Sequence, residues 1–160
     1  MLSAETSLDV DLNQDTITGV PHTPGGTTIN GVNLGTSSFG YTLRDGTSAP
    51  VLVNFNGGQV ASNLNPGGGW SAIAAAVSVS GYDLYWRNSH NGLYARWNIN
   101  SSGALSTGGL LSIPELLSAE TSLGVDLNQD SITGVPHTPG ATTIHGVNLG
   151  FSSFGYTLLL

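Results

Sequence analysis

One long segment of the chain occurs twice. Residues 2–43 recur at residues 117–158, and only five of these 42 positions differ. The five differences are Asp9/Gly124, Thr16/Ser131, Gly26/Ala141, Asn30/His145 and Thr36/Phe151. The segment is repeated, but the stretch between its two copies is not. This pattern indicates that the chain is part of a longer array of repeats. We therefore expect the end of one unit at 1–24, one complete unit at 25–134, and a linker with the first strands of a third unit at 135–160.

The composition favours a folded, turn-rich β protein. The chain carries 23 glycines, and 8 % of its residues are charged, against about 25 % in typical globular proteins. A net charge of −7 with three Lys or Arg residues argues against a surface that follows nucleic-acid phosphates. The sequence has no cysteine for a disulfide, and no stretch approaches the roughly 20 apolar residues of a membrane span.

Alternation of apolar and polar residues predicts mainly antiparallel β structure. The Ala run within 70–79 would tolerate a helix, but a strand is favoured because no helix stop follows it. The prolines at 20–25 and 135–140 predict extended linkers. The expected strands are Thr27–Leu34, Phe39–Leu43 after a turn at 35–38, Val51–Phe55, a return at Gln59–Leu64, Trp70–Val79, the hairpin Tyr82–Arg87 with Leu93–Ile99, and Ala104–Ser106.

One short helix is expected before the second acidic loop. Ser112 and Glu115 have the spacing of a capping box, and Pro114 stands in the first turn, where its missing N–H does no harm. Gly124 can end the helix after about three turns. The predicted unit is therefore an antiparallel β-sheet or sandwich repeat with one short helix and an acidic loop.

The acidic loop is the candidate metal site. Oxygens at positions 1, 3 and 5 and a carbonyl two residues later wrap Ca²⁺ in EF-hand-like loops. Asp126, Asn128, Asp130 and the Ile132 carbonyl have this spacing, and Glu120 could add a carboxylate. The first copy repeats the pattern at Asp11, Asn13, Asp15 and Ile17. The alternative is a turn in which the Asp and Asn side chains bond their own backbone.

Aromatic residues are the candidate ligand-binding groups. If exposed, Tyr85, Tyr94 or Trp70 could stack on sugar rings, which would make the chain a carbohydrate-binding module. The alternative, which we favour, places Trp86 and Trp97 in the core and leaves Tyr85 and Tyr94 as the exposed pair. The four histidines lack the spacing of a zinc site, and no Ser lies in a nucleophile elbow, so we expect no enzyme.

Three motifs in order carry a family resemblance. They are Ser80-Gly-Tyr-Asp-Leu-Tyr-Trp86, then Tyr94-Ala-Arg-Trp97 with Asn100-Ser-Ser-Gly103, then Glu120-Thr-Ser-Leu-Gly-Val-Asp-Leu-Asn-Gln-Asp130. Together they resemble the tryptophan-rich C-terminal repeat domain of large cyanobacterial and other bacterial surface or haemolysin-like proteins. The resemblance implies export, a place in long modular proteins and no established catalytic activity. We expect any export signal to lie outside this sequence.

These features predict a non-catalytic, extracellular structural repeat of a bacterial surface protein or filament. Residues 142–160 begin a unit without its remainder, so their apolar side chains are expected to be partly uncovered. An open strand edge is a template for strand addition by another chain. We therefore expect head-to-tail self-association by strand complementation, with neighbouring repeats or copies of the chain as partners. The alternative function is a carbohydrate-binding adhesion module, with glycans as partners.

Overall fold

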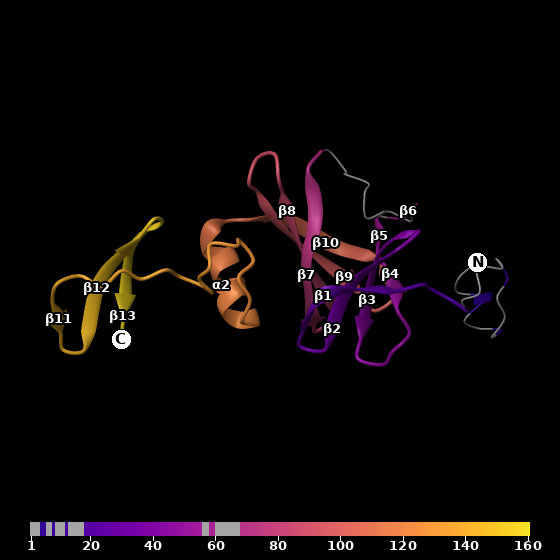
Figure 1. The fold of residues 1–160 in the computed structure, drawn as a ribbon, viewed down its shortest axis with the longest axis horizontal. Coiled ribbons are helices and arrows are strands. Elements are labelled where there is room, and N and C mark those ends of the chain that lie inside the picture. Colours follow the sequence, from indigo (N-terminus) through magenta and orange to yellow (C-terminus); the bar gives the residue numbers. More distant parts are fainter. Residues whose placement is uncertain (1–3, 6–7, 9–11, 13–17, 56–57, 60–67) are drawn as a thin grey trace. The chain divides into compact units, whose positions relative to one another are not determined.

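The chain forms two compact units, residues 1–110 and residues 111–160, in a computed structural model. The structure describes residues 4–5, 8, 12, 18–55, 58–59 and 68–160. Strands dominate the first unit, whereas the second unit combines three strands with the one helix that is defined among the described residues (Figure 1). The predicted fold class, mainly antiparallel β, is confirmed.

The first sheet is an antiparallel meander extended by a short strand. Its order is β1-β2-β3-β4, with β1 at Thr23–Ile29, β2 at Val32–Ser37, β3 at Gly40–Asp45 and β4 at Val51–Leu52. The predicted single strand Thr27–Leu34 is wrong, because Asn30 (φ 49°) and Gly31 (φ 86°) turn the chain between β1 and β2. An Asn-Gly pair adopts positive φ readily and makes the tight turn of a hairpin.

Two further boundaries differ from the prediction. The turn expected at 35–38 lies later, since β2 runs to Ser37 and pairs with Gly40 across residues 38–39. The stretch at 20–25 is not all linker, because β1 already begins at Thr23 and contains Pro24. A proline is tolerated there because β1 is the edge strand of its sheet.

The second sheet has the order β10-β9-β8-β7. Its strands are β7 at Trp70–Ser78, β8 at Gly81–Asn88, β9 at Tyr94–Asn100 and β10 at Leu105–Leu111. The hairpin of β8 and β9 is confirmed, as is the choice of strand over helix for β7. A separate small hairpin joins β5, Asn54–Phe55, to β6, Gly58–Gln59, and the predicted continuation at 60–64 lies outside the described residues.

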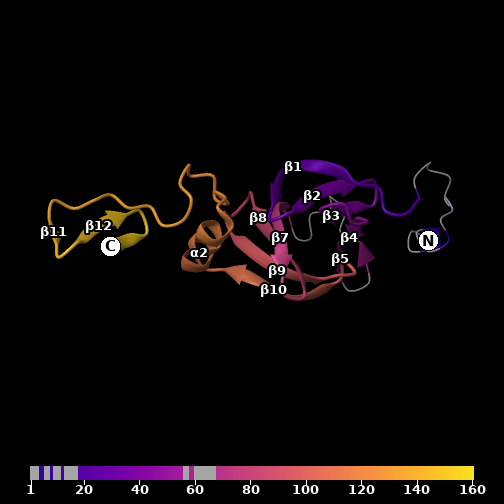
Figure 2. The same ribbon diagram turned by 90° about the horizontal axis from the view of Figure 1, so that it is seen from below.

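The core of the first unit lies between these two sheets (Figure 2). Trp86 is 1 % exposed and meets Tyr41 edge-on, with ring centroids 5.4 Å apart. The Tyr41 hydroxyl accepts a hydrogen bond from the Ala72 amide across the sheets. The buried cluster consists of Val32, Tyr41, Leu43, Val53, Ala75, Leu84, Trp86, Ala95 and Ile99.

The second unit contains helix α2, Ile113–Leu123, and a three-stranded meander of order β11-β12-β13. The helix begins and ends where the sequence predicts: Glu115 accepts a bond from the Ser112 amide at 2.8 Å, and Gly124 adopts a left-handed φ of 67°. The strands are β11 at Thr143–Ile144, β12 at Val147–Ser152 and β13 at Gly155–Leu159. No helix in the described part of the chain is long and apolar enough to cross a membrane.

Candidate functional site

The first meander, which we define as residues 22–45, is held together by a half-buried histidine. His22 Nδ1 lies 2.8 Å from the Thr42 hydroxyl, and Nε2 lies 3.2 Å from the Asn33 amide oxygen. The amide oxygen can only accept, so Nε2 carries the proton and Nδ1 accepts from the hydroxyl. Gly35 provides the room, since a Cβ there would lie 2.4 Å from His22 Cε1. Burial lowers the pKa of His22 below its ordinary value of 6.5.

The second meander, residues 137–159, repeats this arrangement. His137 Nδ1 lies 2.7 Å from the Thr157 hydroxyl, and its Nε2 lies 3.1 Å from the Asn148 amide oxygen. A Cβ at Gly150 would lie 2.5 Å from His137 Cε1. The two copies therefore share one internal hydrogen-bond pattern. Both histidines lie in the stretches predicted to be linkers, and this role was not predicted, although their recurrence within the repeat was a signal.

One face of the first meander is covered by the second sheet. Val32 and Leu43 are fully buried, and Tyr41 is 6 % exposed. All three belong to the core cluster that includes Leu84 and Trp86. Register places Leu34 opposite Leu43 and Thr36 opposite Tyr41, so Leu34 and Thr36 lie on the same face.

The equivalent face of the second meander is uncovered. Tyr156 is 87 % exposed where its counterpart Tyr41 is 6 %, and Leu158 is 68 % exposed where Leu43 is fully buried. Phe151, which replaces Thr36, is 56 % exposed and pairs with Tyr156. Two nearly identical sequences thus form the same meander in two environments. The prediction that the apolar residues of 142–160 are partly uncovered is confirmed.

The edge of the second meander is open as well. In the first meander, β3 pairs with β4 through Thr42 with Leu52 and Leu43 with Val51. Among the described residues, no strand pairs with the corresponding edge of β13, which ends its sheet. The second meander therefore lacks both an edge strand like β4 and a covering sheet like β7–β9, which the first meander has.

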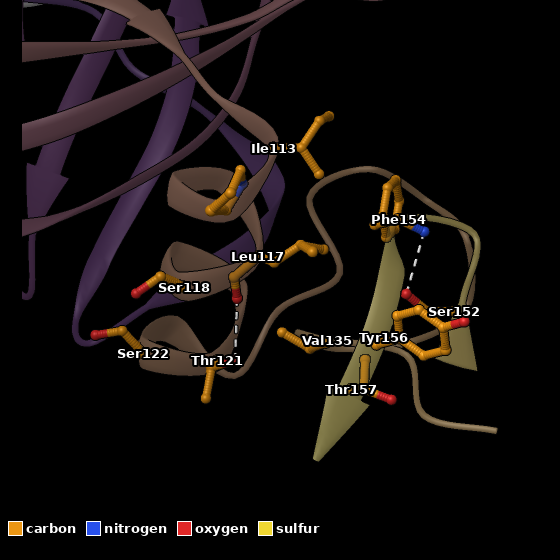
Figure 3. A pocket seen from close by; sticks show the side chains of 11 residues that line it. Ile113, Leu117, Ser118, Thr121, Ser122, Val135, Ser152, Phe154, Tyr156 and Thr157 are labelled. Atoms are coloured by element: carbon orange, nitrogen blue, oxygen red, sulfur yellow. Dashed lines mark hydrogen bonds between the residues drawn. The ribbon is translucent and has the colours of Figure 1, made fainter. Parts of the chain in front are cut away.

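Within the second unit, helix α2 and the second meander line a cavity of about 740 Å³ (Figure 3). Ile113 and Leu117 of the helix, Val135 of the connecting segment, and Phe154 and Tyr156 of the meander contribute its apolar side chains. Figure 3 shows Phe154 and Tyr156 on the meander side and Leu117 on the helix side. The cavity adds apolar surface next to the uncovered face.

The acidic loop after α2 is closed by its own backbone. Asp126 Oδ1 accepts bonds from the Gln129 and Asp130 amides, and Oδ2 accepts from the Ser131 amide at 2.7 Å. Asn128 Oδ1 accepts from the Asp130 amide. Gln129 and Ser131 both have positive φ, 64° and 73°, a conformation that costs a non-glycine residue about 1 kcal/mol. The hydrogen bonds offset that cost.

Asp130 completes the same loop. Its Oδ1 accepts from the Ile132 amide at 2.9 Å, and its Oδ2 accepts from the Asn128 side-chain amide at 3.1 Å. The predicted alternative, a turn in which Asp and Asn side chains bond their own backbone, describes this geometry.

Glu120 anchors the loop from the helix. Its side chain is fully buried, and its carboxylate accepts hydrogen bonds from the amides of Leu127 at 3.1 Å, Asn128 at 3.0 Å and Gly134 at 3.0 Å. Glu5 is buried in the same way and accepts from the amides of Leu12 and Gly19. Glu120 is predicted to add a carboxylate to the metal site, and in the structure that carboxylate accepts hydrogen bonds from the backbone.

The loop retains donors for a cation. Asp126 Oδ2, Asn128 Oδ1 and both Asp130 oxygens each accept one hydrogen bond, and each can offer a second lone pair. Four such oxygens and the Ile132 carbonyl fit the chemistry of Ca²⁺, but fall below the six to eight ligands it takes. No group of three His, Cys, Asp or Glu side chains with metal-binding spacing occurs among the described residues. The first-copy candidates Asp11, Asn13, Asp15 and Ile17 lie outside the described residues.

The aromatic residues divide between core and surface differently from the prediction. Tyr85 is 4 % exposed, so the expectation that its ring is free is wrong; burial raises the pKa of its hydroxyl. Tyr85 lies on β8 next to the core residues Leu84 and Trp86, and strand alternation alone did not reveal that both faces of β8 are covered. Tyr94 and Trp70 are half-buried.

A separate hollow of about 340 Å³ lies in the first unit beside Trp70. Trp97 and Phe55 line it and stack on each other, with centroids 5.6 Å apart and an interplanar angle of 21°. Trp86 also lines it, and the buried Trp86 Nε1 has no hydrogen-bond partner in the described part of the chain. The hollow has an aromatic lining without a charged side chain.

Comparison with known protein families finds a match over more than half of the chain. Residues 32–134 match the tryptophan-rich Synechocystis species C-terminal domain, a span that runs from β2 through α2 and the acidic loop. The chain belongs to this family. The match covers the core residues Trp86 and Ile99 as well as the Glu120 anchor, so the family unit combines the two-sheet core with the helix and its loop. No curated protein and no solved structure matches the chain.

Proposed function

We propose that the chain is a non-catalytic structural repeat of an extracellular bacterial surface protein, in which each unit is joined to the next by sheet completion. One observation carries the proposal: the same meander is covered in its first copy and uncovered in its second. Tyr41 and Tyr156 occupy equivalent positions, yet they are 6 % and 87 % exposed. The uncovered face of the second meander would be completed by a surface like the one that covers the first meander, namely β4 and the β7–β9 sheet.

The covering partner has a defined composition. The face of the first meander packs on Ala75, Leu84 and Trp86, and the edge of β3 pairs with β4, while the Val53 amide donates to the Tyr41 carbonyl at 2.9 Å. A neighbouring repeat or a second copy of the chain carries these same residues. Association is therefore head to tail, because the meander at the end of one unit meets the sheet surface of the next.

The extracellular location and the long modular context are parts of this proposal. They are supported by the resemblance of the three motifs around Trp86, Trp97 and Asp126 to domains of exported proteins, and by membership of the tryptophan-rich family. Protease treatment of intact cells tests the location. Loss of the chain from intact cells supports exposure at the surface, and protection until the cells are lysed contradicts it.

Calcium is proposed as a weak, structural ligand of the acidic loop. The support is the set of oxygens with a remaining lone pair on Asp126, Asn128 and Asp130, together with the Ile132 carbonyl. An ion there would add to a loop that Glu120 already holds through three backbone bonds. Calcium would rigidify the end of a unit without being needed to form it.

Carbohydrate binding is the second candidate, and the hollow beside Trp70 is the observation that favours it. Trp97 and Phe55 offer ring faces on which a sugar could stack. A sugar also needs convergent polar groups, and the side chains around the hollow are apolar or aromatic. Titration of the intrinsic tryptophan fluorescence with a panel of polysaccharides tests this function. A saturable shift supports it, and an unchanged spectrum contradicts it.

The main experiment supplies the missing cover. A second copy of residues 44–134 is joined after Leu158, so that the second meander gains its own β4 and β7–β9 sheet. Amide hydrogen exchange of residues 147–158 should then slow to the rates of residues 32–43. A matched extension that carries Leu84→Asp and Trp86→Asp in the added copy removes the apolar cover and should leave residues 147–158 exchanging rapidly. Equal rates in the original and the intact extended chain would refute sheet completion.

A further inference from the structure

When separate copies of the chain associate, two meanders compete for the same covering surface. The described residues contain two meanders but one covering surface, formed by β4 and the β7–β9 sheet, and the first meander already occupies it. Sheet completion between copies, on which this inference rests, therefore requires the second meander of one copy to displace the first meander of another. Exchange of identical meanders would bury no additional surface. A difference between the two copies must favour the incoming one.

Three of the five sequence differences fall within the meanders. Asn30 and His145 occupy the same turn position with φ of 49° and 50°, and Gly26 has no neighbour within 4 Å of an added Cβ. Position 36/151 is different. Thr36 pairs with Tyr41 on the covered face, so a larger side chain here meets the core.

A cavity of about 240 Å³ lies beside Thr36 in the first unit. Ala72 and Ile73 of β7 form one part of its wall, and the rest belongs to the first meander itself: residues 23–27, 34–36 and 41. The short Thr36 side chain leaves this space unfilled. In the second meander, the equivalent position carries Phe151, whose ring is 56 % exposed.

We propose that Phe151 is the docking residue through which the second meander of one copy enters another copy. The incoming meander brings its own equivalents of the resident wall residues, Tyr156 among them, and its Phe151 ring then fills the space that Thr36 leaves open against Ala72 and Ile73 of the acceptor. Transfer of the apolar ring from water into this cavity makes uptake of a meander that carries Phe151 about tenfold more favourable than uptake of the same meander with threonine at this position.

The displacement propagates from copy to copy. An acceptor that takes up an incoming Phe151 still presents its own second meander to the next copy. Such a contact is heterologous and does not close on itself, so it produces an open series of copies. The main chain of the incoming meander needs little change, because Phe151 already pairs with Thr138 as Thr36 pairs with Thr23.

Sedimentation velocity over a wide range of protein concentration tests this mechanism with two reciprocal variants. Phe151→Thr makes the two meanders alike at this position and should weaken association about tenfold. Thr36→Phe gives the resident meander the same ring, which removes the advantage of the incoming one, and should weaken association by a similar factor. Thr36→Val, which changes the polarity without filling the cavity, is the matched control and should associate within about twofold of the original chain.

Thermal unfolding of Thr36→Phe provides a readout that does not depend on association. The ring should raise the midpoint of the first unit, because it fills a cavity next to the core. A lowered midpoint would show that the cavity cannot hold a phenylalanine and would overturn the proposal.

The remaining outcomes separate this mechanism from the proposed function. If Phe151→Thr weakens association and Thr36→Phe does not, the exposed ring binds somewhere other than this cavity, and the proposal fails. A monomeric original chain at every concentration also overturns it. In either case, slowed exchange of residues 147–158 in the extended chain would leave sheet completion supported, whereas rapid exchange there would remove the proposed function as well.

Discussion

The buried carboxylate of Glu120 gives a prediction whose size follows from its hydrogen bonds. Glu120 is fully buried and accepts three backbone hydrogen bonds, from Leu127, Asn128 and Gly134. The substitution Glu120→Gln keeps the shape of the side chain. Its carbonyl oxygen can still accept from Leu127 and Asn128, but its NH₂ group faces the Gly134 amide. The change therefore removes the charge and one acceptor together.

The expected loss of local stability is about 3 kcal/mol. Hydrogen bonds to charged groups contribute about 1.5–3 kcal/mol and neutral ones about 0.5–1.5 kcal/mol, so two weakened bonds lose about 2 kcal/mol. A buried amide without an acceptor adds about 1–3 kcal/mol. Glu115→Gln is the matched control on the same helix: Glu115 is exposed, and glutamine also serves in a capping box, so the change should stay within about 0.5 kcal/mol.

Amide hydrogen exchange of residues 124–134 measures this difference directly, because it reports the free energy of local opening. The Glu120→Gln chain should exchange faster in this segment by about two powers of ten, since each 1.4 kcal/mol corresponds to a factor of ten. Residues 81–100 in the first unit should be unaffected. Similar exchange in the Glu120→Gln and Glu115→Gln chains would refute the role of Glu120 as the anchor of the loop.

Three further predictions follow from the same contacts. Leu43→Ala should destabilise the first unit by about 2–5 kcal/mol in denaturant titrations followed by tryptophan fluorescence, whereas Leu158→Ala, at the exposed equivalent position, should change stability by about 0.5 kcal/mol or less. Because the pKa of His22 is lowered in the folded state, the unfolded chain binds the proton more readily. The neutral His22 ring therefore stabilises the folded state above pH 6.5, and this stabilisation is lost as the pH falls below that value. His22→Gln should therefore flatten the decline in melting midpoint between about pH 7 and about pH 5. Calcium should slow amide exchange in residues 124–134 relative to EGTA, and equal rates would leave Asp126 as a backbone-bonded turn residue.

Features set by near neighbours in the chain were predictable from the sequence. The helix follows from Ser112, Glu115 and Gly124, and the β8–β9 hairpin follows from the alternation around Trp86 and Trp97. The exception among local features is the Asn30-Gly31 turn, where weak alternation across TTINGVNL suggested one strand. The Asn-Gly pair was the stronger signal, because it supplies two consecutive residues that tolerate positive φ.

Features that depend on distant packing were not predictable. The exposure of Tyr85 depends on what covers the second face of β8, and strand alternation contains no information on that. The role of Glu120 depends on a loop that returns to the helix 14 residues later at Gly134. A glutamate on the helix that precedes a metal-like loop suggests a ligand, whereas its burial and its three amide partners make it a structural acceptor.

Comparison of the two copies of the meander distinguishes the hydrogen bonds that a meander forms by itself from the burial that its neighbours add. His22 and His137 make matching bonds, at 2.8 and 2.7 Å to a threonine hydroxyl and at 3.2 and 3.1 Å to an asparagine oxygen. These contacts lie inside each meander, so they form whether or not the apolar face is covered. The proposed docking would then have little backbone left to order, and its entropic cost would be confined to side chains and rigid-body freedom. A preformed meander with an uncovered face is therefore suited to connect one unit to the next, which an unstructured tail of the same composition would do at a greater cost in chain entropy.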